Sequence, residues 1–175
     1  IHRVVIGSGD PNPLVAGRGI ALLREHGVEV TEHVLEEKCR RLNFLFFHYI
    51  QTKRPYTALK YAMTLDGKIA SYTGASQWIT GETARAHVHA LRNQYRGILV
   101  GVGTVLADDP LLTCRLPGGR NPVRIICDSQ LRTPLTAQVV KTAQETPTLL
   151  ATTCKEETRW DPYQAAGCEI LPLPD

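Results

Sequence analysis

An α/β fold with parallel strands is predicted by three features of this chain. Residues 3–33 have the pattern of a strand, a helix and a second strand. From residue 56 onward, short apolar segments again alternate with helical ones, and the apolar run at 97–100 leads directly into a glycine pair. Strands that alternate with helices usually form parallel sheets with right-handed crossovers, so both parts are predicted to be α/β.

The first part begins with a strand over residues 3–6, which is followed by dense turn residues at 7–13 (GSGDPNP). A helix is predicted over 19–26, where Gly27 ends it, and a half-buried strand over 28–33. A further helix is predicted over 36–49, and its second half is rich in aromatic residues. Roughly 50 residues bury too little surface to be stable alone, so this part is predicted to be an incomplete folding unit.

A polar segment at 51–55 (QTKRP) is predicted to be a linker, and the pattern restarts after it. The elements expected beyond it are a strand over 56–63, a flexible loop over 70–76, a helix over 82–92, a strand over 97–100, a short helix over 104–107, and strands over 123–127, 148–152 and 169–173.

The composition is typical of a globular protein, and its small positive charge is compatible with small anionic ligands. The 175 residues are 43% hydrophobic and 21% charged, with a net charge of +3. No dense block of lysine and arginine indicates nucleic acid, and no apolar run is long enough to span a bilayer. The five cysteines form no C-x-x-C pair, and no export signal opens the chain. We therefore expect reduced thiols, a cytoplasmic location and no membrane partner.

The helix predicted over 82–92 has two distinct faces. Thr80 is its expected N-cap. One face is apolar and the other basic; the apolar residues are Ala84, Val88 and Leu91, and the basic ones are Arg85, His89, Arg92 and Arg96. Arginine grips phosphate with two parallel hydrogen bonds, so the basic face is a candidate phosphate site. A solvated helix face is the commoner explanation of such a pattern taken alone.

Gly101 and Gly103 with Thr104 follow the apolar strand at a predicted helix start, where backbone N–H groups can hold a phosphate. The full dinucleotide fingerprint is missing because position 106 is leucine, so a plain tight turn stays open. Asp108 and its neighbour could orient a substrate hydroxyl or amine, or simply form a turn.

Three further side chains are candidates for a ligand site. Lys60 on the predicted strand 56–63 could anchor a phosphate or polarise a carbonyl, or it could face solvent. Trp78 could stack on a nicotinamide or base, or pack in a core. Ser76 could donate to a substrate or cap a turn. No metal site is predicted, because the histidines are scattered and no zinc-deaminase signature is present.

Several of these motifs resemble the bifunctional deaminase–reductase family of bacterial riboflavin biosynthesis, in the same order and spacing. They are residues 10–17 (DPNPLVAG), Lys60 with 65–68 (LDGK), 76–80 (SQWIT), 101–110 (GVGTVLADDP), and 121–124 (NPVR) with Asp128 and Ser129.

The resemblance implies a fold and an activity. Residues 1–50 would be the C-terminal β-α-β end of a cytidine-deaminase-like domain, 51–55 a linker, and 56–175 an incomplete reductase domain that resembles dihydrofolate reductase. The implied enzyme is an NADPH-dependent oxidoreductase that reduces the ribosyl group of 5-amino-6-(5-phosphoribosylamino)uracil to a ribityl chain. Its parent would also deaminate the preceding pyrimidine, using zinc in a part that is absent here. A homo-oligomer through the reductase domain is expected.

The resemblance also implies roles for individual residues. NADPH contacts would fall at Ala62, Trp78, Thr104, Asp108 and Ser129, alongside Gly101 and Gly103. Substrate contacts would fall at Ser76, Arg92, Leu112 and Arg115, and the groups nearest the reacting centre would be Lys60 and Asp108. The family's zinc motif and its later glutamate and glycine-rich segment are absent from the chain. The alternative is therefore a truncated, non-catalytic nucleotide-binding or dimerisation module.

Overall fold

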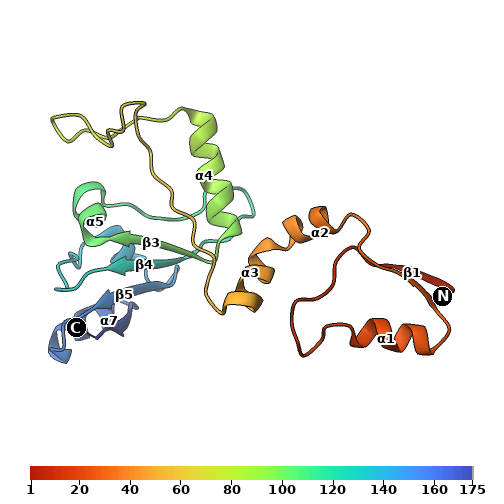
Figure 1. Ribbon diagram of the computed structural model, residues 1–175. Coiled ribbons are helices and arrows are strands. Elements are labelled where there is room, and N and C mark those ends of the chain that lie inside the picture. Colours follow the sequence, from red (N-terminus) through yellow and green to blue (C-terminus); the bar gives the residue numbers. More distant parts are fainter. Residues whose placement is uncertain (175) are drawn as a thin grey trace. The chain divides into compact units, whose positions relative to one another are not determined.

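The computed structural model describes residues 1–174 and divides the chain into two compact units, with the second beginning at Ala62 (Figure 1). Both units are of the α/β class with parallel strands, as predicted. Among residues 1–174, no helix is long and apolar enough to cross a membrane.

The first unit contains the predicted β-α-β element. Strands β1 (Arg3–Val5) and β2 (Glu29–Thr31) pair in parallel, and helix α1 (Arg18–Glu25) joins them. The helix predicted over 36–49 is two helices, α2 (Glu36–Leu42) and α3 (Phe44–Thr52), separated at Asn43. None of residues 1–61 is fully buried, so this unit has no closed core of its own.

Two predictions are wrong, the strand over 56–63 and the N-cap at Thr80. The strand expected over 56–63 is absent, because no strand among the described residues pairs with this segment and an extended chain needs such a partner for its backbone groups. Helix α3 extends through Thr52 into the expected linker. The N-cap of the next helix is Gly81, not the expected Thr80, and no side chain caps that helix.

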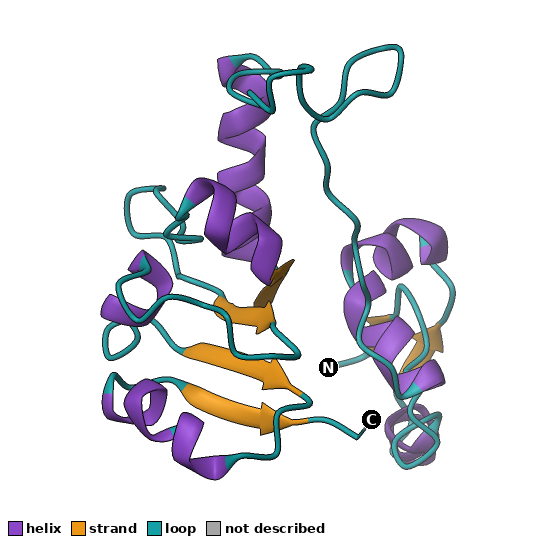
Figure 2. Ribbon diagram, turned by 90° about the vertical axis from the view of Figure 1, so that its left-hand side faces the viewer, coloured by secondary structure: helices purple, strands orange, loops and turns teal. Residues whose placement is uncertain are grey.

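The second unit is built on four parallel strands in sequence order, β3-β4-β5-β6. Figure 2 shows successive strands beside one another with connecting helices along one side. Its elements are α4 (Glu82–Gln94), β3 (Gly97–Gly101), α5 (Val102–Asp108), β4 (Val123–Cys127), α6 (Gln138–Lys141), β5 (Thr148–Thr152), the 3₁₀ turn η1 (Glu157–Arg159), α7 (Asp161–Ala165) and β6 (Glu169–Pro172).

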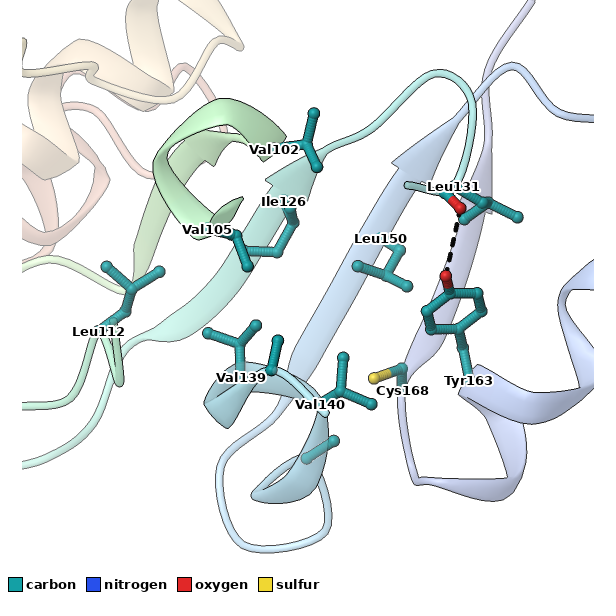
Figure 3. Close-up of a cluster of buried hydrophobic side chains, with 12 residues drawn as sticks. Val102, Val105, Leu112, Ile126, Leu131, Val139, Val140, Leu150, Tyr163 and Cys168 are labelled. Carbon is teal, nitrogen blue, oxygen red and sulfur yellow. Dashed lines mark hydrogen bonds between the residues drawn. The ribbon is translucent and has the colours of Figure 1, made fainter. Parts of the chain in front are cut away.

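The core lies on one face of this sheet, where helices α5, α6 and α7 cover it (Figure 3). Ile126 of β4 and Leu150 of β5 are register partners in its centre, and both are fully buried. Full burial of such side chains contributes roughly 1.5–3 kcal/mol each. The helices supply the covering side chains, which include Val102, Val105, Val139, Val140 and Tyr163.

A buried arginine ties this core to the loop before β4. Arg124 has no exposed surface, and its guanidinium donates to the carbonyl oxygens of Leu111, Thr142 and Thr146 and to the Thr142 hydroxyl, at 2.7–3.2 Å. Burial lowers the pKa of this guanidinium from its ordinary value. Arg124 thereby connects the sheet to residues 111–113, next to predicted substrate contacts.

The opposite face of the sheet carries exposed apolar side chains, among them Leu99 at 62% and Leu171 at 42% exposure. Parallel sheets are normally covered on both faces. Within the second unit, the helices that join the strands leave this face open. Its residues alternate with those of the covered face, as the strand geometry requires.

Candidate functional site

Two predicted cofactor residues lie at the carboxyl edge of the sheet. Gly101 ends β3 and pairs in register with Cys127, the last residue of β4. Thr104 follows Gly101 in helix α5, and Ser129 follows Cys127 after one residue; both are exposed. Ligands of open parallel sheets bind outside the carboxyl ends of the strands. The fold therefore brings the Thr104 and Ser129 segments to the edge where a ligand is expected.

The two glycines at this edge border open space. A Cβ atom added to Gly101 or Gly103 would meet no atom within 4 Å. Gly101 is the N-cap of α5 and has an extended conformation, so neither glycine is needed to relieve crowding within the chain. The space beside them is available to a ligand that approaches the backbone closely.

Hydrogen bonds from buried groups hold the main chain of the loop that carries Ser129. Asp128 is 1% exposed, and its Oδ2 accepts hydrogen bonds from the backbone N–H and the hydroxyl of Thr133, both at 2.7 Å. The hydroxyls of Thr152 and Thr153 donate to the Ser129 carbonyl at 3.0 and 3.2 Å. These bonds fix the main chain of Ser129 and leave its side chain exposed.

Two members of the basic face of helix α4, His89 and Arg92, pack against residues 113–115, whereas Arg96 is exposed. Arg92 is half-buried, and its Nη1 donates to the Thr113 carbonyl at 2.9 Å, while its Nε is buried without a hydrogen-bond partner. Burial, and then the nearby Arg115 charge, lower the pKa of Arg92. Within the described residues, the Arg115 charge therefore acts on Arg92 without a neutralising carboxylate, an arrangement that suits a bound anion.

His89 belongs to the same cluster. Its Nδ1 accepts a hydrogen bond from the Arg115 backbone N–H at 3.2 Å, which requires the neutral ring with its proton on Nε2. The Cys114 thiol lies 3.5 Å from the His89 carbonyl. Burial, Arg92 and Arg115 lower the pKa of His89 below its ordinary value of 6.5. The neutral ring therefore helps to hold the Arg115 main chain.

This arrangement predicts a specific pH dependence. The unfolded chain binds a proton at His89 near pH 6.5, and the folded chain binds it at a lower pH, so the unfolded state holds more protons in between. The stability that His89 contributes is present above pH 6.5 and is lost as the pH falls toward the lowered pKa. We expect the unfolding free energies of the wild type and His89→Asn to converge between pH 7 and about 5.

The matched control is His87→Asn, because His87 is exposed on the same helix. This variant removes an exposed imidazole and leaves the hydrogen bond between His89 and the Arg115 main chain in place. A His89→Asn difference that grows on acidification would contradict the role of the neutral ring.

Trp78 lies before helix α4 with 71% of its surface exposed, so it is not a core residue. The guanidinium carbon of Arg85 lies 4.7 Å from the centre of the indole ring. Arg85 and Arg92 are seven residues apart on α4 and therefore share one face, about 10 Å apart along the axis. The exposed indole and the Arg92 cluster thus flank the same helix face.

The remaining predicted residues are less closely grouped. Leu112 is 5% exposed and belongs to the core, so its side chain is not free to contact a ligand. Asp108 is the exposed last residue of α5, whereas Asp109 has a structural task and accepts a hydrogen bond from the Gln138 N–H at 2.8 Å. Ser76 and Ala62 are half-buried. Lys60 is exposed and belongs to the first unit.

Sequence reasoning missed Arg124 and Asp128 as supports of the site loops. The available signal was an arginine inside the otherwise apolar strand 123–127, where a charged residue requires buried partners. Across residues 1–174, no group of three or more His, Cys, Asp or Glu side chains is placed to hold a metal ion.

Comparison with known proteins decides the family. Residues 55–165 match the protein family described as the RibD C-terminal domain. The chain belongs to this family. This match includes every second-unit residue discussed above as a candidate ligand contact, from Ala62 to Ser129.

Curated relatives carry the name riboflavin biosynthesis protein RibD. The protein from Actinobacillus pleuropneumoniae is 57% identical over 171 residues, which cover 98% of this chain and 46% of the relative. The one from Aquifex aeolicus is 47% identical over 99% of this chain and 48% of its own length. The chain therefore spans about half the length of the curated relatives it matches.

Solved structures of the RibD family have the same fold. A diaminohydroxyphosphoribosylaminopyrimidine deaminase/5-amino-6-(5-phosphoribosylamino)uracil reductase from Thermotoga maritima is 40% identical with a TM-score of 0.82, over 98% of this chain and 54% of its own. RibD from Acinetobacter baumannii is 33% identical with a TM-score of 0.85, over 99% of this chain and 49% of its own. The α/β fold and the relation to riboflavin-biosynthesis enzymes are thereby confirmed.

Proposed function

We propose that this chain carries the reductase site of riboflavin biosynthesis, which reduces the ribosyl group of 5-amino-6-(5-phosphoribosylamino)uracil to a ribityl chain with NADPH. The observation that carries the proposal is the carboxyl edge of the sheet. There, open space beside Gly101 and Gly103 adjoins the exposed Thr104 and Ser129. The name of the Thermotoga maritima relative, a deaminase and 5-amino-6-(5-phosphoribosylamino)uracil reductase, also supports the proposal.

The residues present fit NADPH. Open glycine positions admit a phosphate close to the backbone, and the Thr104 and Ser129 hydroxyls can donate to it. Asp108 at the end of α5 and Ala62 would complete the contacts, and the exposed Trp78 would present a flat surface to an aromatic ring. NADPH supplies the hydride when it is bound, and the protein supplies binding and orientation.

The substrate phosphate would bind at the Arg92 and Arg115 cluster. Neither guanidinium has a carboxylate ion-pair partner in the part of the chain that the structure describes. An anion there would meet two positive charges, of which the Arg92 guanidinium is held by its hydrogen bond to the Thr113 carbonyl, and arginine is a usual means of phosphate recognition. Ser76 and Leu112 would hold the rest of the substrate, with Asp108 as the polar group of the second unit proposed nearest the reacting carbon.

The proposal also assigns a domain to the first unit. We assign residues 1–50 to the end of a deaminase domain. Residues 10–17 and the deaminase named in the T. maritima relative support this assignment. Its zinc-dependent chemistry would belong to a part outside this sequence. A homo-oligomer through the reductase domain also remains part of the proposal.

Gly103→Ala tests whether NADPH binds at the carboxyl edge of the sheet. An added methyl group meets no protein atom and replaces a helical glycine, so stability should rise by about 0.5–1 kcal/mol. The same methyl group would occupy the ligand's space, so the NADPH dissociation constant should rise about tenfold or more, equivalent to 1.4 kcal/mol or more. Thermal unfolding and a fluorescence titration with NADPH measure the two effects.

Gly19→Ala is the matched control, because Gly19 is a helical glycine of α1 that also borders open space. It should raise stability similarly without changing NADPH affinity. Unchanged NADPH affinity in Gly103→Ala, with the wild type binding NADPH, would remove α5 from the proposed site.

A further inference from the structure

The indole of Trp78 is an exposed aromatic side chain with one partner that orients it. It lies in a segment without helix or strand and is 71% exposed. The Arg85 guanidinium carbon lies 4.7 Å from the ring centre, which is within the range of a cation–π interaction. Holding a large apolar ring in one orientation on an exposed surface costs rotamer entropy. A fixed partner is therefore needed to offset that cost.

Arg85 is itself fixed. Its Nη1 donates to the Thr80 carbonyl at 2.6 Å, and its side chain is 34% exposed. Its nearest carboxylate, Glu82, lies 3.9 Å away with a side chain that is 95% exposed, so that ion pair contributes little. The main-chain hydrogen bond and the position on α4 therefore set the location of the guanidinium.

We propose that Arg85 is a positioning residue for cofactor binding, which holds Trp78 with one indole face against its guanidinium and leaves the other face to a flat ring of the ligand. The proposal rests on NADPH as the cofactor. It adds a specific role for Arg85, whose basic character alone would suggest a phosphate contact.

Two substitutions of Arg85 separate its role in orienting Trp78 from the effect of its positive charge alone. Arg85→Met keeps an unbranched stem and removes the planar cation, and Arg85→Lys keeps the charge but loses the plane. Glu82→Gln is the matched control, since it removes only the weak ion pair. The chain has two tryptophans, so Trp160→Phe serves as the background that isolates the Trp78 signal.

The first measurement needs no cofactor. Acrylamide quenching reports how accessible the Trp78 indole is to solvent, and fluorescence anisotropy reports how freely it moves. We expect Arg85→Met to raise the quenching constant and lower the anisotropy, with Arg85→Lys intermediate and Glu82→Gln unchanged. Far-ultraviolet circular dichroism checks that each variant is folded. A Trp78 signal unaltered in folded Arg85→Met would overturn the proposal.

The second measurement is an NADPH titration of the same proteins. Loss of the oriented ring should raise the dissociation constant of Arg85→Met about 3–10-fold. An Arg85→Met variant that frees Trp78 but binds NADPH like the background would overturn the link to the cofactor. If the Trp160→Phe protein with Arg85 intact binds no NADPH, both the role of Arg85 in cofactor binding and the NADPH assignment are overturned. The quenching result would still decide whether Arg85 orients Trp78.

Discussion

Replacing Arg124 with methionine is expected to lower the free energy of unfolding by about 3–5 kcal/mol, because the buried acceptors of four hydrogen bonds lose their donor. The Leu111 carbonyl lies in the loop before β4, and the Thr142 and Thr146 carbonyls lie in the turn between α6 and β5, so Arg124 joins two loop segments to the sheet. Each buried acceptor left without a partner costs about 1–3 kcal/mol, partly offset where water enters.

Chemical denaturation of the wild type and the variant measures this effect. Tyr163→Phe is the control, because its buried hydroxyl donates to the Leu131 and Thr133 carbonyls from the same core. It should cost about 1–2 kcal/mol. A loss below about 1 kcal/mol in Arg124→Met would mean that water or rearrangement satisfies these carbonyls, contrary to the buried network described above.

The second large effect is expected at Arg92. Arg92→Ala should raise the dissociation constant of 5-amino-6-(5-phosphoribosylamino)uracil about 10–100-fold, since a fixed guanidinium beside phosphate contributes roughly 1.5–3 kcal/mol. The affinity for NADPH should change less than about threefold, because the proposed cofactor contacts lie at other elements. Calorimetric titration of each ligand separates the two, and the KM of the reductase reaction should follow the substrate affinity.

Arg96→Ala is the matched control, because Arg96 is an exposed arginine just beyond the same helix. It should leave both affinities within about twofold. Since Arg92 also holds the Thr113 carbonyl, Arg92→Lys is informative: it keeps the charge and should recover part of the substrate affinity. Equal losses of substrate and NADPH affinity in Arg92→Ala would indicate a general structural defect and contradict the assignment.

The strands of the second unit could be predicted because each is a short apolar run between turn residues. The expected bounds of β4 and β5 match the structure residue for residue. Helices α6 and α7, of four and five residues, were missed because such short segments show no complete helical period. The strand over 56–63 was wrong because its local sequence says nothing about whether a neighbouring strand is available to pair with it.

The candidate site shows the same limit. The Gly101–Thr104 segment and the basic face of α4 are local patterns, and sequence reasoning found both. The direction in which that face packs was not predictable, because the bond from Arg115 to His89 spans 26 residues and that from Arg92 to Thr113 spans 21. The role of Arg124 depends on contacts 13–22 residues away, which no local pattern encodes.

The central claim is that NADPH binds at the carboxyl edge beside β3 and β4, and calorimetric titration of this 175-residue chain with NADPH tests it most directly. We predict saturable one-site binding that is weakened at least about tenfold in Thr104→Trp, because the exposed Thr104 position would then hold an indole in the ligand's space. Binding of equal strength in the wild type and folded Thr104→Trp, or no binding by the folded wild type, would contradict the account.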